Sequence, residues 1–218
     1  MRVHLRIKTT NEVIPFDHQP LLTGTIHKWF GWNEEHGDVS LYSFSQLTGG
    51  RVLKVGFKFD QETSFFFSSH NIELIKRIIH GIKSDPSMFN GLTVSDIIIQ
   101  EAPDLADRTL FKAASPIFIK RWNGEKEDHI LFNDPRADNC LKESLLTKMR
   151  KAGLEPGVFN IRFDTSYPKA ATKKITYNGI QNRANWCPVI IEGDIKVKLF
   201  AWNVGLGNST GIGFGAIK

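Results

Sequence analysis

The chain has 218 residues, 41% of them hydrophobic, which is enough to bury the core of one large domain or of two small ones. No run approaches the roughly 18 consecutive apolar residues of a membrane span, and residues 1–9 alternate charged and apolar side chains, so we expect neither a signal peptide nor a transmembrane helix. Cys140 and Cys187 lie far apart, and neither Cys-x-x-Cys nor His-Glu-x-x-His is present. This favours the reducing cytoplasm and argues against a disulfide framework, a metal site or a cofactor.

Charge is divided unevenly between the two halves. Residues 1–107 carry 10 Lys or Arg against 13 Asp or Glu, a net charge of −3, whereas residues 108–218 carry 18 against 10, a net charge of +8. A basic half favours a polyanionic partner, since phosphate contacts to RNA or DNA give a salt-dependent affinity. The alternative is that the excess charge only keeps the protein soluble.

Hydrophobic periodicity divides the first half into strands and helices. Apolar residues alternate with polar ones in the first strand, recur at helical spacing up to Gly31 in the first helix, and form one stripe along the second. A Thr-Gly-Gly turn at 48–50 would join the second and third strands into a hairpin. In chain order we expect a strand at 3–7, a helix at 21–30, strands at 40–47 and 51–59, a short strand at 65–67, a helix at 71–83 and a strand at 94–100.

The second half repeats this order. We expect a strand at 117–121, a helix at 138–152, strands at 158–164 and 186–191, and a last strand at 212–217. Residues 195–204 fit a strand and a helix equally well. The pattern therefore predicts an α+β protein of two tandem β-α-β-β-α-β units, residues 1–107 and residues 108–218. A single β-rich domain is the alternative.

The last fourteen residues, 205–218, hold five glycines in eleven positions. Because glycine has no Cβ, such a run lets several N–H groups approach one ligand, usually a phosphate. It is neither a Walker loop, since no Lys follows, nor a dinucleotide-binding loop, since the spacing differs and no further βα unit follows. The alternative is a flexible or helix-capping tail, although Ile212, Phe214 and Ile217 favour a packed segment.

Four stretches, taken in their order along the chain, carry a resemblance to a known family. They are Phe-Asp-His-Gln-Pro-Leu-Leu-Thr-Gly-Thr-Ile at 16–26, Tyr-Ser-Phe-Ser-Gln-Leu at 42–47, Ser-Pro-Ile-Phe at 115–118 and the glycine run from 205. With them the chain resembles the CRISPR-associated endoribonucleases that cut precursor CRISPR RNA within its repeats, members of the repeat-associated mysterious protein superfamily. The resemblance implies two ferredoxin-like domains with antiparallel sheets, metal-independent cleavage that releases guide RNAs, and RNA contact by the glycine-rich loop. The chain departs from commoner members in Pro20 and in being short.

The implied reaction uses the 2′-OH of the RNA as the nucleophile and leaves a 2′,3′-cyclic phosphate and a 5′-OH. A histidine, whose ordinary pKa is about 6.5, suits the proton transfers at neutral pH. His27 is our catalytic candidate, because the small residues Thr23, Gly24 and Gly31 around it leave the imidazole reachable and the family places an acid or base histidine at about this point. The alternative is a solvated histidine near the end of a helix.

Further candidates bind RNA or assist the reaction. His36 in the polar loop 33–38 could fold over the site, Tyr42 could hydrogen-bond a phosphate oxygen, and Lys54 and Lys58 could supply positive charge, although a solvated loop or strand face explains these residues as well. The expected RNA-binding residues are Gly205, Gly207, Asn208, Ser209, Thr210, Gly211 and Gly213 in the loop, and Lys173, Lys174 and Arg183 in a basic hairpin. The expected partner is CRISPR repeat RNA, with a CRISPR effector complex as a second one, for a monomer or homodimer.

Two rival functions stay open. A catalytically inactive relative would hold the repeat RNA, or form part of an effector complex, with the same fold and the same basic half. A nucleotide-dependent enzyme would use the glycine loop for ATP or NAD, but it would need the lysine or the βα unit that is missing after the loop.

Overall fold

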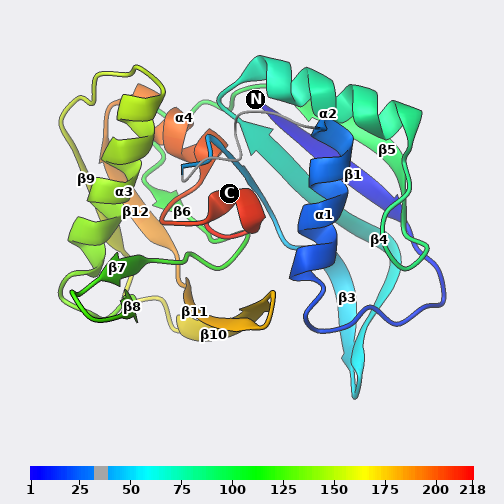
Figure 1. The fold of residues 1–218 in the computed structure, drawn as a ribbon. Coiled ribbons are helices and arrows are strands. Elements are labelled where there is room, and N and C mark those ends of the chain that lie inside the picture. The colour runs from blue at the N-terminus through cyan, green and yellow to red at the C-terminus, as the bar shows by residue number, and fades with distance from the viewer. Residues whose placement is uncertain (32–38) are drawn as a thin grey trace.

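The first half of the chain folds into a sheet covered by two helices. The computed structural model describes residues 1–31 and 39–218, and the side chains of all of these except 60–62, so His36 lies outside the described residues. The elements are β1 (Arg2–Lys8), α1 (Gln19–Phe30), β2 (Tyr42–Phe44), β3 (Thr48–Leu53), β4 (Gly56–Ser69), α2 (Ile72–Ser84) and β5 (Thr93–Gln100). The strands are antiparallel in the order β2-β4-β1-β5, with β3 beside β4, and α1 and α2 cover one face (Figure 1).

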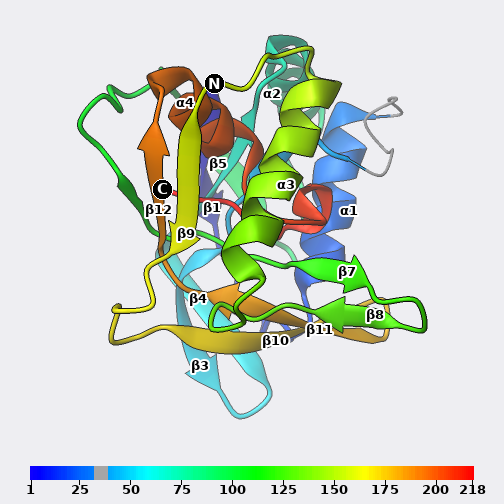
Figure 2. The same ribbon diagram turned by 90° about the vertical axis from the view of Figure 1, so that its left-hand side faces the viewer.

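The second half combines a small sheet, two hairpins and two helices. Its elements are β6 (Leu110–Phe111), β7 (Lys120–Trp122), β8 (Glu127–His129), α3 (Ala137–Lys151), β9 (Phe159–Phe163), β10 (Ala171–Tyr177), β11 (Ile180–Trp186), β12 (Val189–Gly193), α4 (Ile195–Val204) and the short 3₁₀ helix η2 (Thr210–Ile212). The sheet is antiparallel in the order β6-β12-β9, whereas β7–β8 and β10–β11 pair only as hairpins (Figure 2).

Each half has its own apolar core. In the first, Leu22 and Ile26 of α1 pack with Phe65 and Phe67 of β4. In the second, the apolar faces of α3 and α4 pack with β9 and β12. The predicted α+β class with antiparallel sheets is therefore confirmed. Among the described residues, no helix is both long enough and apolar enough to cross a membrane.

The helices predicted from periodicity form within two residues of their expected ends. α1 ends where Gly31 takes a φ of 63° and donates its N–H to the carbonyl of His27 at 3.0 Å. α2 begins where the Asn71 side chain accepts from the N–H of Glu73. The ambiguous stretch 195–204 is a helix, because the Asp194 side chain caps its N-terminus by accepting from Lys196 N.

Three predictions about the strands are wrong. The single strand expected at 186–191 is divided, since β11 ends at Trp186 and β12 begins at Val189. The turn expected at 48–50 lies at 54–55, and Gly49 and Gly50 instead form an irregularity in the pairing of β3 with β4. A Cβ at Gly50 would lie 2.6 Å from the Phe59 ring, so this glycine is needed for packing and not for a turn. The last strand expected at 212–217 does not form. That stretch follows η2 and bonds irregularly to residues 112–116, through an isolated bridge between Ala113 and Ile217 and through single bonds such as that from Ala114 N–H to the carbonyl of Ala216.

Arg2 ties the start of the chain to its end. Its side chain is buried, with the guanidinium carbon 3.7 Å from the Phe66 ring centre and 3.6 Å from that of Trp202. Its Nη2 donates to the carbonyls of Trp202 at 2.9 Å and Ile217 at 2.8 Å. These contacts join β1 to α4 and to the C-terminal segment, and so fix the two halves against each other.

We expect Arg2→Ala to lower the free energy of unfolding by about 2–4 kcal/mol, because it removes two desolvated cation–π contacts and leaves two carbonyls without a donor. Urea unfolding measures this. Arg6→Ala is the matched control, since Arg6 lies on the same strand with an exposed side chain and should change stability by less than about 0.5 kcal/mol. Equal unfolding midpoints for the two variants would show that Arg2 does not hold the halves together.

Candidate active site and RNA interface

His27 lies in the last turn of α1, and its side chain is half-buried rather than sealed in the core. Its Nε2 is 3.3 Å from the hydroxyl of Tyr42, and its ring packs at 5.2 Å from that of Phe30. The Tyr42 hydroxyl in turn donates to the carbonyl of Gly211 at 3.3 Å. Because a phenol has one proton, a Tyr42 that donates to Gly211 accepts from His27 Nε2–H, which orients the imidazole.

The C-terminal segment, residues 205–218, lies directly against α1. The Gln19 amide donates to the carbonyl of Ile212 at 2.7 Å, and the Thr23 hydroxyl approaches the same carbonyl at 3.4 Å. Figure 1 shows η2 between α1 and α3, at the seam between the two halves of the molecule. Residues 189 and 193 positions apart in the sequence thus meet at α1, the helix that carries His27.

The glycines of this segment are needed mainly because protein atoms lie where their Cβ atoms would be. A Cβ at Gly213 would fall 1.6 Å from Gln19 Nε2, and one at Gly211 would fall 2.3 Å from Ser40 Oγ. Close packing of the backbone is therefore a sufficient reason for these glycines. Sequence reasoning assigned them to phosphate contact and did not foresee this packing.

Only part of the segment has groups to offer an RNA. Gly205, Gly207, Thr210, Gly211 and Gly213 are buried, while Asn208 and Ser209 are half-exposed. The N–H groups of Gly205 and Gly213 already donate to the carbonyls of Ala201 and Thr210. The fold therefore uses these two N–H groups, and RNA contact by the rest of the loop stays a prediction.

The predicted basic residues of the second half share one hairpin. Lys173 and Lys174 lie on β10, Arg183 lies opposite Lys174 on β11, and all three are exposed. Both lysines line a cavity of about 510 Å³ between this hairpin and the β3–β4 hairpin, together with aromatic side chains. Those aromatic residues are Phe16, Phe57, Phe59 and Trp186. Sequence reasoning missed this combination of lysines and rings, because its members come from four separate segments.

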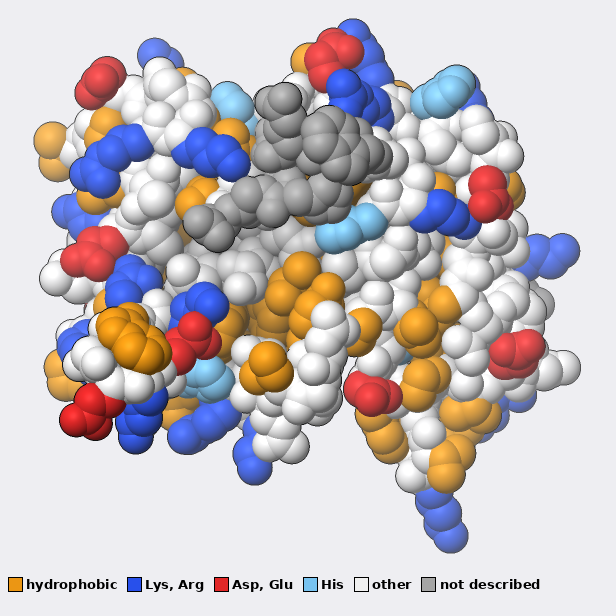
Figure 3. Space-filling view, viewed as in Figure 1, with side chains coloured by type: hydrophobic (Ala, Val, Ile, Leu, Met, Phe, Trp, Pro, Cys, Tyr) orange, Lys and Arg blue, Asp and Glu red, His pale blue; other side chains and the backbone are white. Residues whose placement is uncertain are grey.

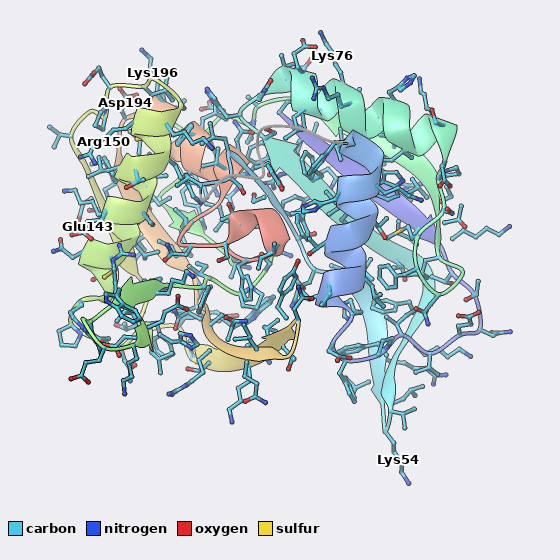
Figure 4. All side chains as sticks on the ribbon, viewed as in Figure 1. Lys54, Lys76, Glu143, Arg150, Asp194 and Lys196 are labelled. Atoms are coloured by element: carbon cyan, nitrogen blue, oxygen red, sulfur yellow. The ribbon has the colours of Figure 1, made fainter. Side chains whose placement is uncertain are left out.

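Lys54 is placed away from the candidate catalytic residue. It lies at the tip of the β3–β4 turn, far from the upper part of α1 that carries His27 (Figure 4). Lys and Arg side chains are instead numerous over the part of the face where α3 and the β7–β8 hairpin lie (Figure 3). Among the described residues, no group of three or more His, Cys, Asp or Glu side chains is arranged to hold a metal ion.

Sequence reasoning also missed a second cavity, between α3 and the C-terminal segment. This α3 cavity measures about 280 Å³, and its lining includes Ser40, Arg121, Lys148, Asn208, Ser209 and Thr210. Lys148 is only 4% exposed, and its ammonium donates to the carbonyls of Gly205 at 3.1 Å and Val204 at 3.3 Å and to the Thr210 hydroxyl at 3.3 Å. Burial lowers the pKa of Lys148 to about 7.

The lowered pKa of Lys148 predicts how stability depends on pH. Between pH 7 and about 10 the unfolded chain keeps this proton and the folded chain does not, so the free energy of unfolding rises with pH, by up to about 1.4 kcal/mol per unit. Below pH 7 both states hold the proton and this contribution is constant. We expect the stability of the wild type relative to Lys148→Met to grow from pH 7 to pH 9 in urea unfolding.

Lys142→Met is the control for this measurement, because Lys142 lies on the same helix with a half-buried side chain. The difference in free energy of unfolding between the wild type and Lys142→Met should not grow from pH 7 to pH 9. A constant difference between the wild type and Lys148→Met across the same range would contradict the prediction.

The fold is that of the CRISPR-associated repeat-associated mysterious proteins, with ferredoxin-like units in tandem. The family model described as CRISPR associated protein Cas6, C-terminal, matches residues 100–218, more than half of the chain. The chain belongs to the Cas6 family. The resemblance first seen in the sequence is thereby confirmed.

Known relatives match over the full length. A "Putative CRISPR-associated endoribonuclease-like protein Cas6" of Pyrococcus furiosus is 24% identical, and the match covers 100% of this chain and 98% of that protein. A solved structure described as "CRISPR associated protein Cas6" has a TM-score of 0.85 at 25% identity, covering 100% and 98% of the two chains. A second, "An RAMP protein binding different RNA substrates", has a TM-score of 0.87 at 20% identity, covering 100% and 98%.

Proposed function

We propose that this chain is a metal-independent endoribonuclease that cleaves precursor CRISPR RNA within its repeats in the cytoplasm and so releases guide RNAs. The observation that carries the proposal is the half-buried His27 imidazole, held by Tyr42 next to the C-terminal segment at the seam of a Cas6 fold. An imidazole in such a place is open to a substrate yet oriented by a fixed neighbour.

In this proposal the 2′-OH attacks the adjacent phosphorus, the bond to the 5′-oxygen breaks, and the products carry a 2′,3′-cyclic phosphate and a 5′-OH. His27 transfers a proton, either from the attacking 2′-OH or to the departing 5′-oxygen. Tyr42 orients the imidazole, and because its hydroxyl also bonds to Gly211, it links the catalytic group to the C-terminal segment.

RNA binding in this proposal uses the basic hairpin and the exposed part of the segment. Lys173, Lys174 and Arg183 contact phosphates, and rings such as Phe16, which is 52% exposed, offer stacking surfaces in the adjoining cavity. Asn208 and Ser209 supply polar contacts nearer His27. Recognition of this kind reads the shape and the unpaired bases of RNA more than the edges of paired bases.

The second candidate function is binding without cleavage, alone or within an effector complex. It is favoured by the solved relative described as binding different RNA substrates. Such a protein would keep the basic hairpin and the cavities and would need no proton transfer by His27.

Labelled repeat RNA, taken from an array in the genome that encodes the chain and incubated in EDTA, separates the two functions. We expect a single cut within the repeat and no cut in a shuffled RNA of equal length. Tight binding of the repeat with no product under single-turnover conditions would overturn the proposal and favour the binding function.

A further inference from the structure

The α3 cavity contains a buried cation without an anionic partner among the described residues. The three acceptors of the Lys148 ammonium are two carbonyls and one hydroxyl, which are all neutral. Burying a charge is costly unless an opposite charge lies near, and neutral acceptors replace the hydrogen bonds of water without supplying a counter-charge. The cavity beside Lys148 is open to solvent and could admit one.

Resting on the proposed function, we infer that the α3 cavity takes one phosphodiester group of the bound RNA, whose charge Lys148 compensates. The cavity, of about 280 Å³, has room for a group of that size. Two of the three Lys148 bonds are 3.3 Å long and go to neutral acceptors, and a charge-assisted bond to a phosphate oxygen would be shorter and stronger than either. Half-exposed Asn208 and Ser209 line the same cavity and offer further donors.

The position of the cavity connects it to the cleavage site. The Thr210 hydroxyl contacts Lys148, and the carbonyl of the next residue, Gly211, accepts from Tyr42, which contacts His27. A phosphodiester held beside Thr210 therefore sits on the same short stretch of chain that orients the imidazole. It would belong to a nucleotide close to the scissile phosphate.

The other charged side chains near Lys148 are bonded to other groups. Arg121 and Glu143 also line the cavity, but they pair with each other at 3.1 Å. Lys198 of α4 donates to the carbonyls of Leu105 and Ala106 and does not bond within the cavity. Since burial alone lowers the pKa of Lys148 to about 7, a phosphate beside it must raise that pKa again.

The test follows the titration of Lys148 by NMR in protein with ¹³C-labelled lysine. The His27→Ala variant is used, so that the RNA stays intact and His27 does not titrate, and Lys148→Arg assigns the signal. We expect the pKa of Lys148 to rise by one unit or more when repeat RNA is bound. A rise of about one unit, from about 7, implies that the RNA affinity falls about five-fold as the pH rises from 7 to 9. An unchanged Lys148 titration in the RNA complex would overturn the inference.

Two variants distinguish charge from structure. Lys148→Arg keeps a charge that does not titrate, so RNA affinity should stay high and lose its dependence on pH over this range. Lys148→Met should bind the RNA more weakly than the wild type at pH 7, and its RNA affinity should likewise not change with pH. If the RNA affinity of Lys148→Met still falls about five-fold between pH 7 and 9, the effect belongs to another group and the inference is overturned.

The controls separate this inference from the proposed function. If His27→Ala fails to bind repeat RNA at any pH, the proposed function itself fails. If the RNA binds and Lys148 titrates as in the free protein, only the inference fails. Inorganic phosphate at millimolar concentration is tested as a second ligand. If phosphate alone raises the pKa of Lys148 as much as the RNA does, the cavity is a site for free anions and the inference of an RNA subsite is overturned.

Discussion

Replacing His27 with alanine is expected to slow cleavage of repeat RNA by about 10²–10⁴-fold, the usual contribution of a general acid or base. The affinity for the RNA should stay within about three-fold of the wild type, because the imidazole acts on the reacting atoms and the phosphates are held elsewhere. Single-turnover cleavage in EDTA gives the rate, and filter binding gives the affinity. A loss of rate without a loss of affinity marks a group that acts in the transition state.

His80→Ala is the matched control, since His80 lies on α2 with an exposed side chain. The His80→Ala variant should cleave the RNA at the wild-type rate. Tyr42→Phe keeps the ring but removes the hydroxyl that orients His27, so it should lower the rate by less than His27→Ala does. Cleavage by His27→Ala at the wild-type rate would remove His27 from the mechanism.

The second large effect is expected at Gly215, where alanine should lower the free energy of unfolding by about 3–5 kcal/mol. Gly215 has a φ of +71°, a conformation that costs an L-residue about 1–2 kcal/mol, and its Cβ would fall 1.9 Å from the carbonyl oxygen of Leu206. Because that carbonyl is backbone, the clash can be relieved only by shifting the backbone of Leu206 or of Gly215, which distorts the C-terminal segment itself. Cleavage should therefore fall together with stability.

Gly24→Ala provides the comparison. Gly24 lies within α1, and a Cβ there would meet nothing within 4 Å, so alanine should stabilise the protein by about 0.5–1 kcal/mol through its higher helix propensity. Thermal unfolding measured on both variants should give shifts of opposite sign. A Gly215→Ala protein as stable as the wild type would mean that the C-terminal segment is not closely packed.

The helices could be predicted from the sequence because local signals agree with the final packing. In α2 the apolar residues lie on one stripe and Asn71 caps the start, and in α1 Gly31 fixes the end. The strands were harder, since the Gly-Gly pair at 49–50 is compatible with a turn and with an irregular strand. Only the contact of Gly50 with Phe59 decides between them, and that contact belongs to the tertiary structure.

The candidate site, too, could be predicted from the sequence only in part. His27 could be named from its small neighbours and from the resemblance to a family, because both are visible in the sequence. Lys148 could not, since a lysine on an amphipathic helix is ordinarily solvated, and its burial depends on a segment more than 50 residues further along. The sequence predicts that another group packs closely against the glycines. It does not reveal that this group is the rest of the protein and not a phosphate.

The most direct test of the account replaces a single ribose at the mapped cut by its 2′-deoxy form and repeats the reaction in EDTA with the wild-type protein. If the 2′-OH is the nucleophile, the substituted repeat RNA should bind as tightly as the unmodified one and remain uncut, while the unmodified RNA yields a 2′,3′-cyclic phosphate and a 5′-OH. Cleavage of the 2′-deoxy RNA, or products that end in a 3′-OH and a 5′-phosphate, would contradict it.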